Sequence, residues 1–219
     1  MIITVASFKG GVGKTTTAVH LAGCLSVTKD AAKKPETTAL LIDGDPNRSA
    51  TGWSKRGSLP FKVVDERQAA RYVRDYEDIV IDTQARPSRE DLEALAEGCD
   101  LLILPTTPDA LSLDALMQTV DALQGLNDGL GIGRYRVLVT MTPPRPSRDG
   151  EEAQSTLRDA GLQVFNSMIH RRVAFQKAAL SGVLVDAVSD PRAQLGYDEY
   201  SELAQEIVRE IKQSKRDVK

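Results

Sequence analysis

The fold of this 219-residue chain is indicated most clearly by one stretch near its start, Ser7-Phe8-Lys9-Gly10-Gly11-Val12-Gly13-Lys14-Thr15-Thr16. The apolar, β-branched run Ile2–Ala6 precedes it and predicts a buried strand, and the helix-like segment Thr17–Ala22 follows it. Glycines let backbone N–H groups turn towards one anion, and the positive end of a helix that begins there faces the same anion. A strand, a glycine loop and a helix that opens with Gly-Lys-Thr are together typical of a phosphate-binding loop.

Two side chains of this loop have a predicted chemical role. Lys14 can reach the β- and γ-phosphates of a nucleotide, and the Thr15 hydroxyl can bind Mg²⁺. The loop departs from the common Gly-x-x-x-x-Gly-Lys-Thr pattern, because Phe8 stands at the first glycine position. It also has a second lysine, Lys9, five residues before Lys14.

Length and composition indicate a soluble globular protein with one α/β domain over residues 1–219. The net charge of −3 means that any nucleic-acid-binding surface must be local. Cys24 and Cys99 lie in apolar stretches and are predicted to be small core residues, in keeping with a reducing cytosol. The chain begins with the first strand and has no apolar stretch near the roughly 18 residues of a membrane span, so we expect a cytoplasmic protein.

Continuous apolar runs alternate with helical patterns along the chain. This alternation predicts an α/β fold with a single doubly wound, mostly parallel sheet and helices on both faces. The later predicted strands are Ala39–Asp43, Phe61–Val64, Ile79–Asp82, Leu101–Pro105, Arg136–Thr140, Gln163–Phe165 and Gly182–Val185. The later predicted helices are Arg89–Glu97, Leu111–Leu123, Glu151–Ala160, Val173–Leu180 and Tyr197–Lys215, and Lys29–Glu36 and Pro143–Gly150 are predicted surface loops.

Carboxylates follow two of the predicted strands, as Asp43-Gly44-Asp45-Pro46-Asn47 and as Asp82. In a parallel α/β sheet, ligands bind beyond the carboxyl ends of the strands, where the glycine loop also lies. A metal–phosphate site needs oxygen ligands for a hard cation and a group that orients the attacking water. Each acid alone is also compatible with a helix cap or a turn, but beside the glycine loop we favour the metal–phosphate site.

The loop that contains both Lys9 and Lys14 resembles the signature of the ParA/MinD family of ATPases, the deviant Walker A group of phosphate-loop proteins. The resemblance covers nearly the whole chain. Leu104–Pro108 and the block Arg171–Ala178 with Gly182 are similar to later segments of these ATPases. The stretch from Asp45 to Trp53 is most similar to that of the small ParA-type partition and positioning ATPases.

The resemblance implies roles for the site residues, with ATP and Mg²⁺ as cofactors. Asp45, the second acid of an Asp-x-Asp-Pro motif, would position the hydrolytic water. Asp43 and Asp82 would support the metal with Thr15. Lys9 would cross a dimer interface and stabilise charge on the phosphates bound by the other subunit, as a weaker counterpart of an arginine finger. The phosphate-binding set is Lys9, Gly10, Gly11, Val12, Gly13, Lys14, Thr15 and Thr16.

Adenine contacts are implied for the segment after the strand Arg136–Thr140. Met141 and the proline-rich loop with Pro143, Pro144 and Arg145 would close over the base. The asparagine that reads adenine in larger relatives is replaced by Thr140 or Met141, so the contact is expected to be largely with the backbone. A second departure is Gln84-Ala85 in place of the usual proline pair after Asp82-Thr83, which predicts altered switch behaviour.

Three basic groups could contact DNA phosphates if two subunits join, although each alone is more typical of a solvated face. Sparse aromatic residues in these segments favour duplex backbone over single strands. The predicted contact residues are Arg145, Arg171, Arg172, Lys177, Arg209, Lys212, Lys215 and Arg216.

By resemblance we therefore expect an ATP-dependent homodimer that binds non-specific double-stranded DNA on the nucleoid. A ParB-like or cargo-adaptor protein would stimulate hydrolysis, and the cargo would be a plasmid, a chromosome region or a carboxysome. Tyr200, Leu203, Ile207 and Ile211 form one narrow stripe that indicates core packing, which disfavours a MinD-like membrane-cycling ATPase and any membrane partner.

Two further alternatives are a metabolic enzyme on the same fold and a nucleotide-binding protein without hydrolysis. Lys9 and the lack of paired functional cysteines disfavour the first, and Asp45 disfavours the second. His20 and His170 are isolated in the sequence, and we assign no role to either.

Overall fold

The computed structural model describes residues 1–26, 38–124 and 135–217, so the predicted loop Lys29–Glu36 lies outside the described part. Six strands form one sheet in the order β3-β2-β4-β1-β5-β6, and every neighbouring pair is parallel. This arrangement confirms the predicted α/β class and parallel sheet. The strands are β1 (Ile2–Ser7), β2 (Ala39–Gly44), β3 (Lys62–Asp65), β4 (Asp78–Ala85), β5 (Leu101–Thr106) and β6 (Tyr135–Val139).

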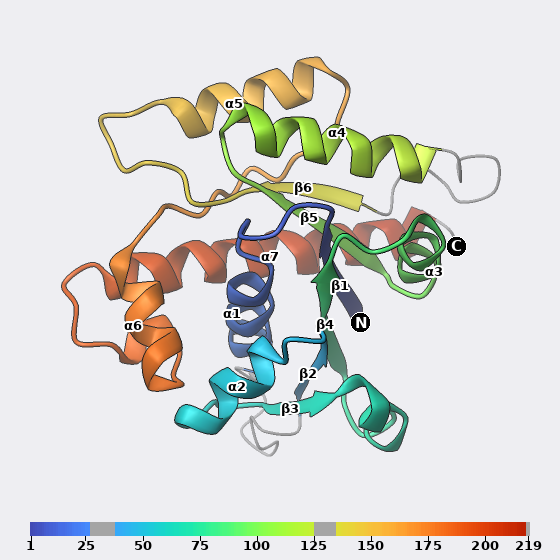
Figure 1. Cartoon of the computed structure of the whole chain (residues 1–219), viewed down its shortest axis with the longest axis vertical. Helices are drawn as coiled ribbons and strands as arrows, with labels where there is room; N and C mark the ends of the chain where they lie inside the picture. The colour runs from blue at the N-terminus through green and yellow to red at the C-terminus, as the bar shows by residue number, and fades with distance from the viewer. Residues whose placement is uncertain (27–37, 125–134, 218–219) are drawn as a thin grey trace.

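Helices cover both faces of the sheet, as a doubly wound fold requires (Figure 1). One face packs against α1, α2, α6 and α7, and the other packs against α3, α4 and α5. The helical elements are α1 (Lys14–Ser26), α2 (Ser49–Arg56), η2 (Glu66–Arg71), α3 (Arg89–Glu97), α4 (Ala110–Gln124), α5 (Asp149–Asp159), α6 (Val173–Ser181), η3 (Val185–Ala187) and α7 (Ala193–Asp217).

The continuous apolar strands arise because each strand has a core on both sides. In β1, Ile3 and Val5 belong to the core under α1 and α7, whereas Ala6 belongs to the core under α3, α4 and α5. A strand with one solvated face would alternate apolar and polar residues instead. Burial on both faces therefore explains why apolar runs located the sheet correctly.

The predicted strand Gly182–Val185 is wrong. Gly182 ends α6 in a left-handed conformation with φ 68°, and the chain then enters the short helix η3. Leu184 and Val185 are buried, but they pack among helices rather than in the sheet. The predicted strand Gln163–Phe165 is extended beside β6 and makes a single isolated bridge, from Val164 to Val137.

Helix α2 was not predicted from the sequence. Its first residues follow a Pro-Asn-Arg turn, and Arg48 adopts a left-handed conformation with φ 51° immediately before the helix. Tertiary contacts hold it in place: Trp53 is buried, and its indole N–H donates to the Val183 carbonyl at 3.0 Å. These contacts come from α6 and its following turn, which no local pattern reveals.

His20 occupies an aromatic cluster where α1 meets α7. Its ring stacks on Tyr200 with centroids 4.9 Å apart, and Phe175 and Trp53 approach edge-on. The Val185 N–H can only donate, so His20 Nε2 accepts it at 3.2 Å and the Nδ1–H donates to the Thr16 carbonyl at 2.8 Å. The ring is therefore neutral, and burial lowers the pKa of His20 to about 4.

This burial makes folding stability depend on pH. The unfolded chain protonates His20 near pH 6.5 and the folded chain only near pH 4, so the stability contribution is present above pH 6.5 and is lost as the pH falls. We predict that His20→Phe is less stable than the parent at pH 7.5, and that the gap narrows by about 1 kcal/mol at pH 5.5. Urea unfolding at both pH values measures it, and an unchanged gap would contradict a neutral buried ring.

Candidate functional site

The site lies at the carboxyl ends of three neighbouring strands. In the sheet register, Asp82 of β4 is paired with Asp43 of β2 on one side and with Val5 of β1 on the other. The loop between β1 and α1 begins directly after this point. The structure therefore brings the glycine loop and both predicted metal-supporting acids to one place, as expected at the switch point of a doubly wound sheet.

The glycine loop spans residues 8–13 and takes two left-handed turns. Gly11 has φ 80° and Gly13 has φ 83°, conformations that side chains rarely adopt. A Cβ on Gly13 would lie 3.5 Å from the Met141 side chain, so this position is also closely packed. Gly10 and Gly11 are exposed, Val12 is buried, and Thr15 and Thr16 are half-buried at the start of α1.

Lys14 lies beneath the loop with 7% of its surface exposed. Its ammonium donates to the Lys9 carbonyl at 3.4 Å, within the loop itself. The pKa of Lys14 is lowered because burial disfavours its charged form, although the carboxylates of Asp82 and Asp45 oppose that shift. A buried cation at the start of a helix is suited to bind an anion, since a phosphate would replace this long contact.

Asp82 is fully buried, and within the described residues neither of its carboxylate oxygens has a hydrogen-bond partner. Burial raises its pKa to about 7, and the charges of Asp43 and Asp45 add to that effect. The nearby Thr15 hydroxyl and Lys14 act in the opposite direction. Such unpaired buried oxygens are costly, and a cation would pair with them.

The donor set fits Mg²⁺ rather than a metal held by protein alone. Within residues 1–26, 38–124 and 135–217, no group of three or more His, Cys, Asp or Glu side chains could hold a metal ion. Mg²⁺ in nucleotide sites uses one or two protein oxygens together with waters and phosphates. The Thr15 hydroxyl and the Asp82 carboxylate are oxygen donors of this kind.

Asp43 is also fully buried, but both of its carboxylate oxygens accept hydrogen bonds from nearby residues. Oδ2 accepts from the Thr51 N–H at 2.8 Å and from the Thr51 hydroxyl at 2.7 Å. Oδ1 accepts from the Asp45 N–H at 3.2 Å. Asp43 thus fixes the first turn of α2 and the position of Asp45, a role that the sequence did not reveal.

Asp45 is held in a tight turn at the edge of the site with 9% of its surface exposed. Its Oδ1 accepts from the Asn47 N–H at 2.8 Å. Arg48 stabilises the turn from outside, because it donates to the Asp43 carbonyl at 2.7 Å and pairs with Asp65 at 3.0 Å. Arg48 was missed in the sequence, where only its place after the acidic motif could have pointed to it.

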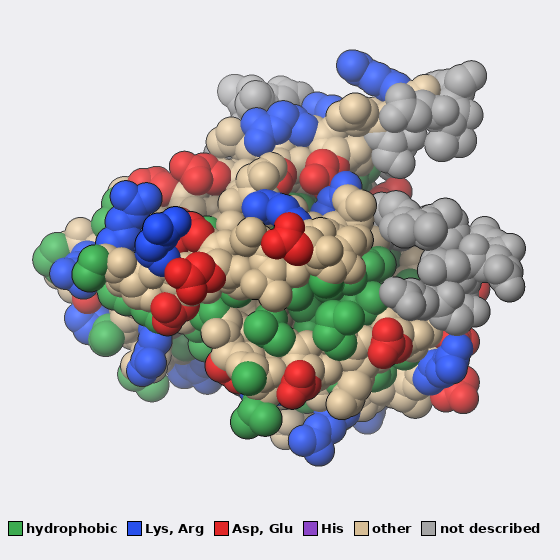
Figure 2. All heavy atoms as spheres, turned by 90° about the horizontal axis from the view of Figure 1, so that it is seen from above, with side chains coloured by type: hydrophobic (Ala, Val, Ile, Leu, Met, Phe, Trp, Pro, Cys, Tyr) green, Lys and Arg blue, Asp and Glu red, His purple; other side chains and the backbone are tan. Residues whose placement is uncertain are grey.

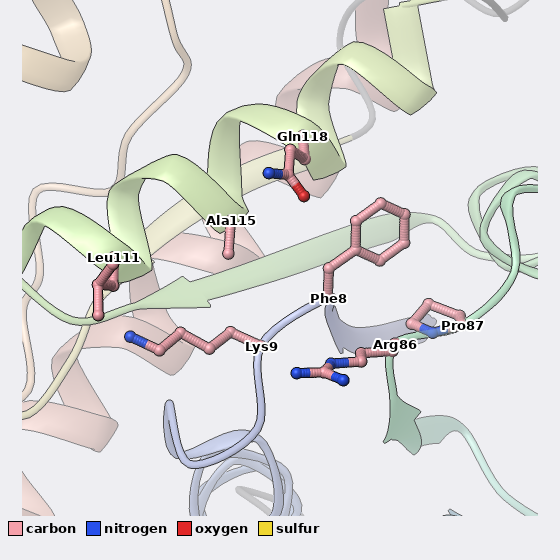
Figure 3. Close-up of a pocket in the computed structure, with 7 residues that line it drawn as sticks. All are labelled: Phe8, Lys9, Arg86, Pro87, Leu111, Ala115 and Gln118. Atoms are coloured by element: carbon pink, nitrogen blue, oxygen red, sulfur yellow. The ribbon is translucent and has the colours of Figure 1, made fainter.

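Lys9 points away from the centre of the glycine loop. Its ammonium donates to the Ser112 hydroxyl at 2.6 Å and pairs with Asp109 at 3.1 Å, both at the start of α4. Figure 3 shows the extended Lys9 side chain reaching towards Leu111, in a surface hollow that Phe8 and Arg86 also line. The Lys14 ammonium thus contacts the glycine loop, whereas the Lys9 ammonium contacts the start of α4.

The segment after β6, for which adenine contacts are predicted, lies beside the glycine loop. The Thr140 hydroxyl lies 2.9 Å from the Val12 carbonyl and 3.1 Å from the Thr106 carbonyl, so it ties the loop to β5. Met141 is 38% exposed, has φ 53° and lies beside Gly13. Pro143 is half-buried, and Pro144 and Arg145 are exposed on the loop that leads to α5.

The departure Gln84-Ala85 lies within the sheet. Both residues belong to β4, and Ala85 is paired with Ser7 across a register shift. The following Arg86 has φ 57°, and its N–H donates to the Ser7 carbonyl at 3.2 Å. The predicted switch segment is therefore bonded to the end of β1, directly before Phe8.

The predicted DNA-contacting residues do not gather on one surface. Glu199 near the start of α7 bonds His170 after β6, whereas Glu210 near its end bonds Arg136 at the start of β6. Helix α7 thus runs opposite to the strands and ends at the edge away from the glycine loop. That end contains the exposed Arg209, Lys212 and Arg216, together with Lys215, whose side chain lies outside the described part.

The remaining predicted DNA-contacting residues lie towards the glycine-loop edge, and two of them are already paired. Arg172 is 11% exposed and pairs with Glu199, and Lys177 pairs with Asp190 at 2.8 Å. Arg145 and Arg171 are exposed, and no carboxylate pairs with either among the described residues.

The sequence from residue 3 to residue 185 matches the family described as CobQ/CobB/MinD/ParA nucleotide binding domain. The chain belongs to this family. Members of the CobQ/CobB/MinD/ParA family that share the ParA/MinD signature are ATPases, and the loop geometry, Lys14 and the acidic strand ends agree with an ATPase. The predicted family and enzyme class are thus confirmed.

Similar proteins within the family cover nearly the whole chain. The maintenance of carboxysome distribution protein A of Gloeobacter kilaueensis is 36% identical over 216 residues, which cover 95% of this chain and 94% of that protein. The chromosome-partitioning ATPase Soj of Treponema pallidum is 28% identical over 249 residues, with 91% and 94% covered. The structure of apo McdA from Cyanthece superposes with a TM-score of 0.67 at 20% identity, with 92% and 98% covered, and supports the fold.

The two fully buried acids are predicted to respond in opposite directions to neutralisation. In EDTA above pH 7, where Asp82 is ionised, Asp82→Asn should raise the free energy of unfolding by about 1–3 kcal/mol, because it removes a buried charge without a hydrogen-bond partner among the described residues. Asp43→Asn should lower it, because an amide cannot accept from both Thr51 and the Asp45 N–H. Both changes should weaken binding of a fluorescent ATP analogue with Mg²⁺. Equal loss of stability in both variants would contradict this view of Asp82.

Proposed function

We propose that this chain is a switch ATPase that dimerises around two ATP molecules and binds non-specific double-stranded DNA in that state. A cargo-adaptor or ParB-like protein then stimulates hydrolysis and releases the dimer. The cycle positions a cargo in the cytoplasm, on the nucleoid. Among plasmids, chromosome regions and carboxysomes, the carboxysome is the favoured cargo.

The similarity to the carboxysome distribution protein of Gloeobacter kilaueensis supports this proposal most strongly. It extends over 95% of the chain, at higher identity than the similarity to the chromosome-partitioning ATPase Soj. The glycine loop adds a second argument. Its second lysine, Lys9, matches the ParA/MinD signature, and that resemblance implies that Lys9 acts on the phosphates bound by a second copy.

The acids supply the hydrolytic part of the proposal. Asp45 is fixed by its turn at the edge of the site, where a carboxylate can orient a water molecule towards the γ-phosphate. Mg²⁺ would be held by Thr15 and Asp82, with Asp43 behind its water shell, and would offset charge on the phosphates. A single lysine in trans gives less rate enhancement than a bidentate arginine, which suits a slow timer that waits for a partner.

A MinD-like membrane-cycling ATPase is less well supported. Tyr200, Leu203 and Ile207 are each at most 1% exposed, so the apolar stripe of α7 packs against the sheet and α1. A helix that binds a membrane surface would need a broad exposed apolar face. Within the described parts of the chain, no helix combines the length and the apolar composition needed to cross a bilayer.

The DNA surface would have to be assembled from small basic groups. Figure 2 shows Lys and Arg side chains in separate groups between acidic ones over the face formed by α4 and α5. A monomer with such a surface binds phosphates weakly, and joining two copies multiplies the contacts. Arg145 and Arg171 are exposed, have no carboxylate partner in the described part of the chain and lie towards the nucleotide edge, whereas Arg209, Lys212 and Arg216 lie at the opposite edge.

Binding to a random-sequence DNA duplex tests the DNA part of the proposal. We expect binding only with ATP and Mg²⁺, not with ADP or without nucleotide, and weaker binding at higher salt. Replacing the basic group that contacts DNA should reduce the slope of the logarithm of the binding constant against the logarithm of the salt concentration by about one per removed charge. The two variants are Arg145→Gln with Arg171→Gln, and Arg209→Gln with Lys212→Gln and Arg216→Gln. Duplex binding that does not depend on the nucleotide, or no duplex binding in any nucleotide state, would contradict the proposal.

The roles of Asp45 and Lys14 predict opposite defects. Asp45→Ala should bind ATP, lose about 100-fold or more in hydrolysis rate and remain on DNA, because the water is no longer oriented. Lys14→Gln should not bind ATP at all. Asp45→Asn is the matched control, since its amide oxygen can still accept the Asn47 N–H. Phosphate release at the parent rate from Asp45→Asn would show that another group positions the water.

A further inference from the structure

Lys9 has two incompatible positions if the proposed function is right. In the structure its ammonium is bonded within its own chain, to Ser112 at 2.6 Å and to Asp109 at 3.1 Å. Action on the phosphates of a second copy requires the same ammonium to leave both groups. Dimerisation and release from α4 are therefore linked, whatever the order in which they occur.

Asp109 is well prepared to hold a cation. Its carboxylate accepts from the Ser112 N–H at 3.0 Å and from the Ser112 hydroxyl at 2.6 Å, and the Thr107 hydroxyl also donates to it. These bonds and the Lys9 ammonium hold the pKa of Asp109 well below its usual range. The carboxylate thus stays ionised and is fixed in place at the first turn of α4.

The bond to Lys9 is separable from the structural task of Asp109. The Ser112 N–H bond makes Asp109 the cap of α4, and asparagine caps helices as well as aspartate does. Asparagine can keep the Oδ1 bond to the Ser112 N–H, but it has no negative charge to hold the ammonium, and its amide NH2 group replaces the Oδ2 acceptor of the Ser112 and Thr107 hydroxyls. Lys9 is 31% exposed and Asp109 is 53% exposed, so the pair is weak enough to open when stronger anions approach.

We propose that Asp109, together with Ser112, is a positioning residue that holds Lys9 on its own chain and sets how much ATP is needed for dimerisation. The phosphates of the second copy compete with Asp109 for the same ammonium. This inference rests on the proposed trans role of Lys9. It adds a threshold: a chain with Lys9 on Asp109 is not competent to dimerise, and only the fraction with Lys9 released contributes to the apparent affinity.

The contact between Lys9 and Asp109 lies close to other parts of the site. Lys9 shares a surface hollow with Phe8, Arg86 and Pro87, which follow β1 and β4, and with Leu111 and Ala115 of α4 (Figure 3). Leu111, which lines this hollow, is 73% exposed. Lys9 therefore lies beside the ends of β1 and β4, two of the three strands that form the nucleotide site.

Sedimentation with a non-hydrolysable ATP analogue and Mg²⁺ tests the threshold. Asp109→Asn keeps the cap and removes the charge, and two contacts open per dimer. We therefore expect half-maximal dimer formation at about threefold to tenfold lower analogue concentration. Asp114→Asn is the matched control, because Asp114 is an exposed acid on the same helix outside these contacts. An unchanged or higher midpoint for Asp109→Asn would overturn the proposal.

A second measurement separates positioning from a structural effect. Acylation of Lys9 by an amine-reactive reagent, read by mass spectrometry, should be several-fold faster in Asp109→Asn and in Ser112→Ala than in the parent or in Asp114→Asn. A lost helix cap would not change Lys9 selectively. Lys9→Ala tests the underlying function: if it still dimerises and hydrolyses ATP normally, the trans role fails. If only Lys9→Ala is defective and Asp109→Asn behaves as the parent, the positioning role alone fails.

Discussion

The register of the parallel sheet is the constraint on which the site depends. Because β2 and β4 are paired in register, Asp43 and Asp82 end side by side, and the β1 loop places Lys14 among them. Three acids and one lysine are thereby at most 9% exposed at one edge. Protein groups satisfy Asp43 and part of Asp45, and Asp82 is left without a hydrogen bond among the described residues. A hard cation would pair with the Asp82 oxygens and offset this negative charge, and the Lys14 ammonium and the N–H groups of the glycine loop would bind the phosphate.

The features predicted correctly from the sequence were those encoded within a few residues. The glycine loop, the buried strands and most helices follow from local spacing, because backbone conformation and burial on two faces act over short distances. Helix α2 and the turn at Gly182 depend instead on contacts between distant segments. Trp53, for example, bonds the Val183 carbonyl, and Val185 bonds His20. A short apolar run after Gly182 looked like a strand because periodicity does not show which neighbour buries it.

For the site too, the sequence predicted which residues take part but not which residues they contact. The acids and lysines that the sequence singled out occur at the expected edge, because each follows a strand or opens a helix. Their partners could not be predicted: Thr51 fixes Asp43, Thr140 bonds the loop, and Asp109 holds Lys9 from 100 positions away. Proximity of this kind is set by the crossover connections of the sheet. The consequence is that Lys14 and Lys9, five residues apart, act on separate parts of the protein.

We propose that one loop supplies a lysine to each of two nucleotide sites, Lys14 to its own and Lys9 to that of a second copy. The most direct measurement is a crystal structure of the Asp45→Ala variant with ATP and Mg²⁺. We expect two copies with each Lys9 ammonium within hydrogen-bond distance of the phosphates bound by the other copy, and with Asp109 released. A bound nucleotide with Lys9 still on Asp109, or with Lys9 on the phosphates of its own chain, would contradict it.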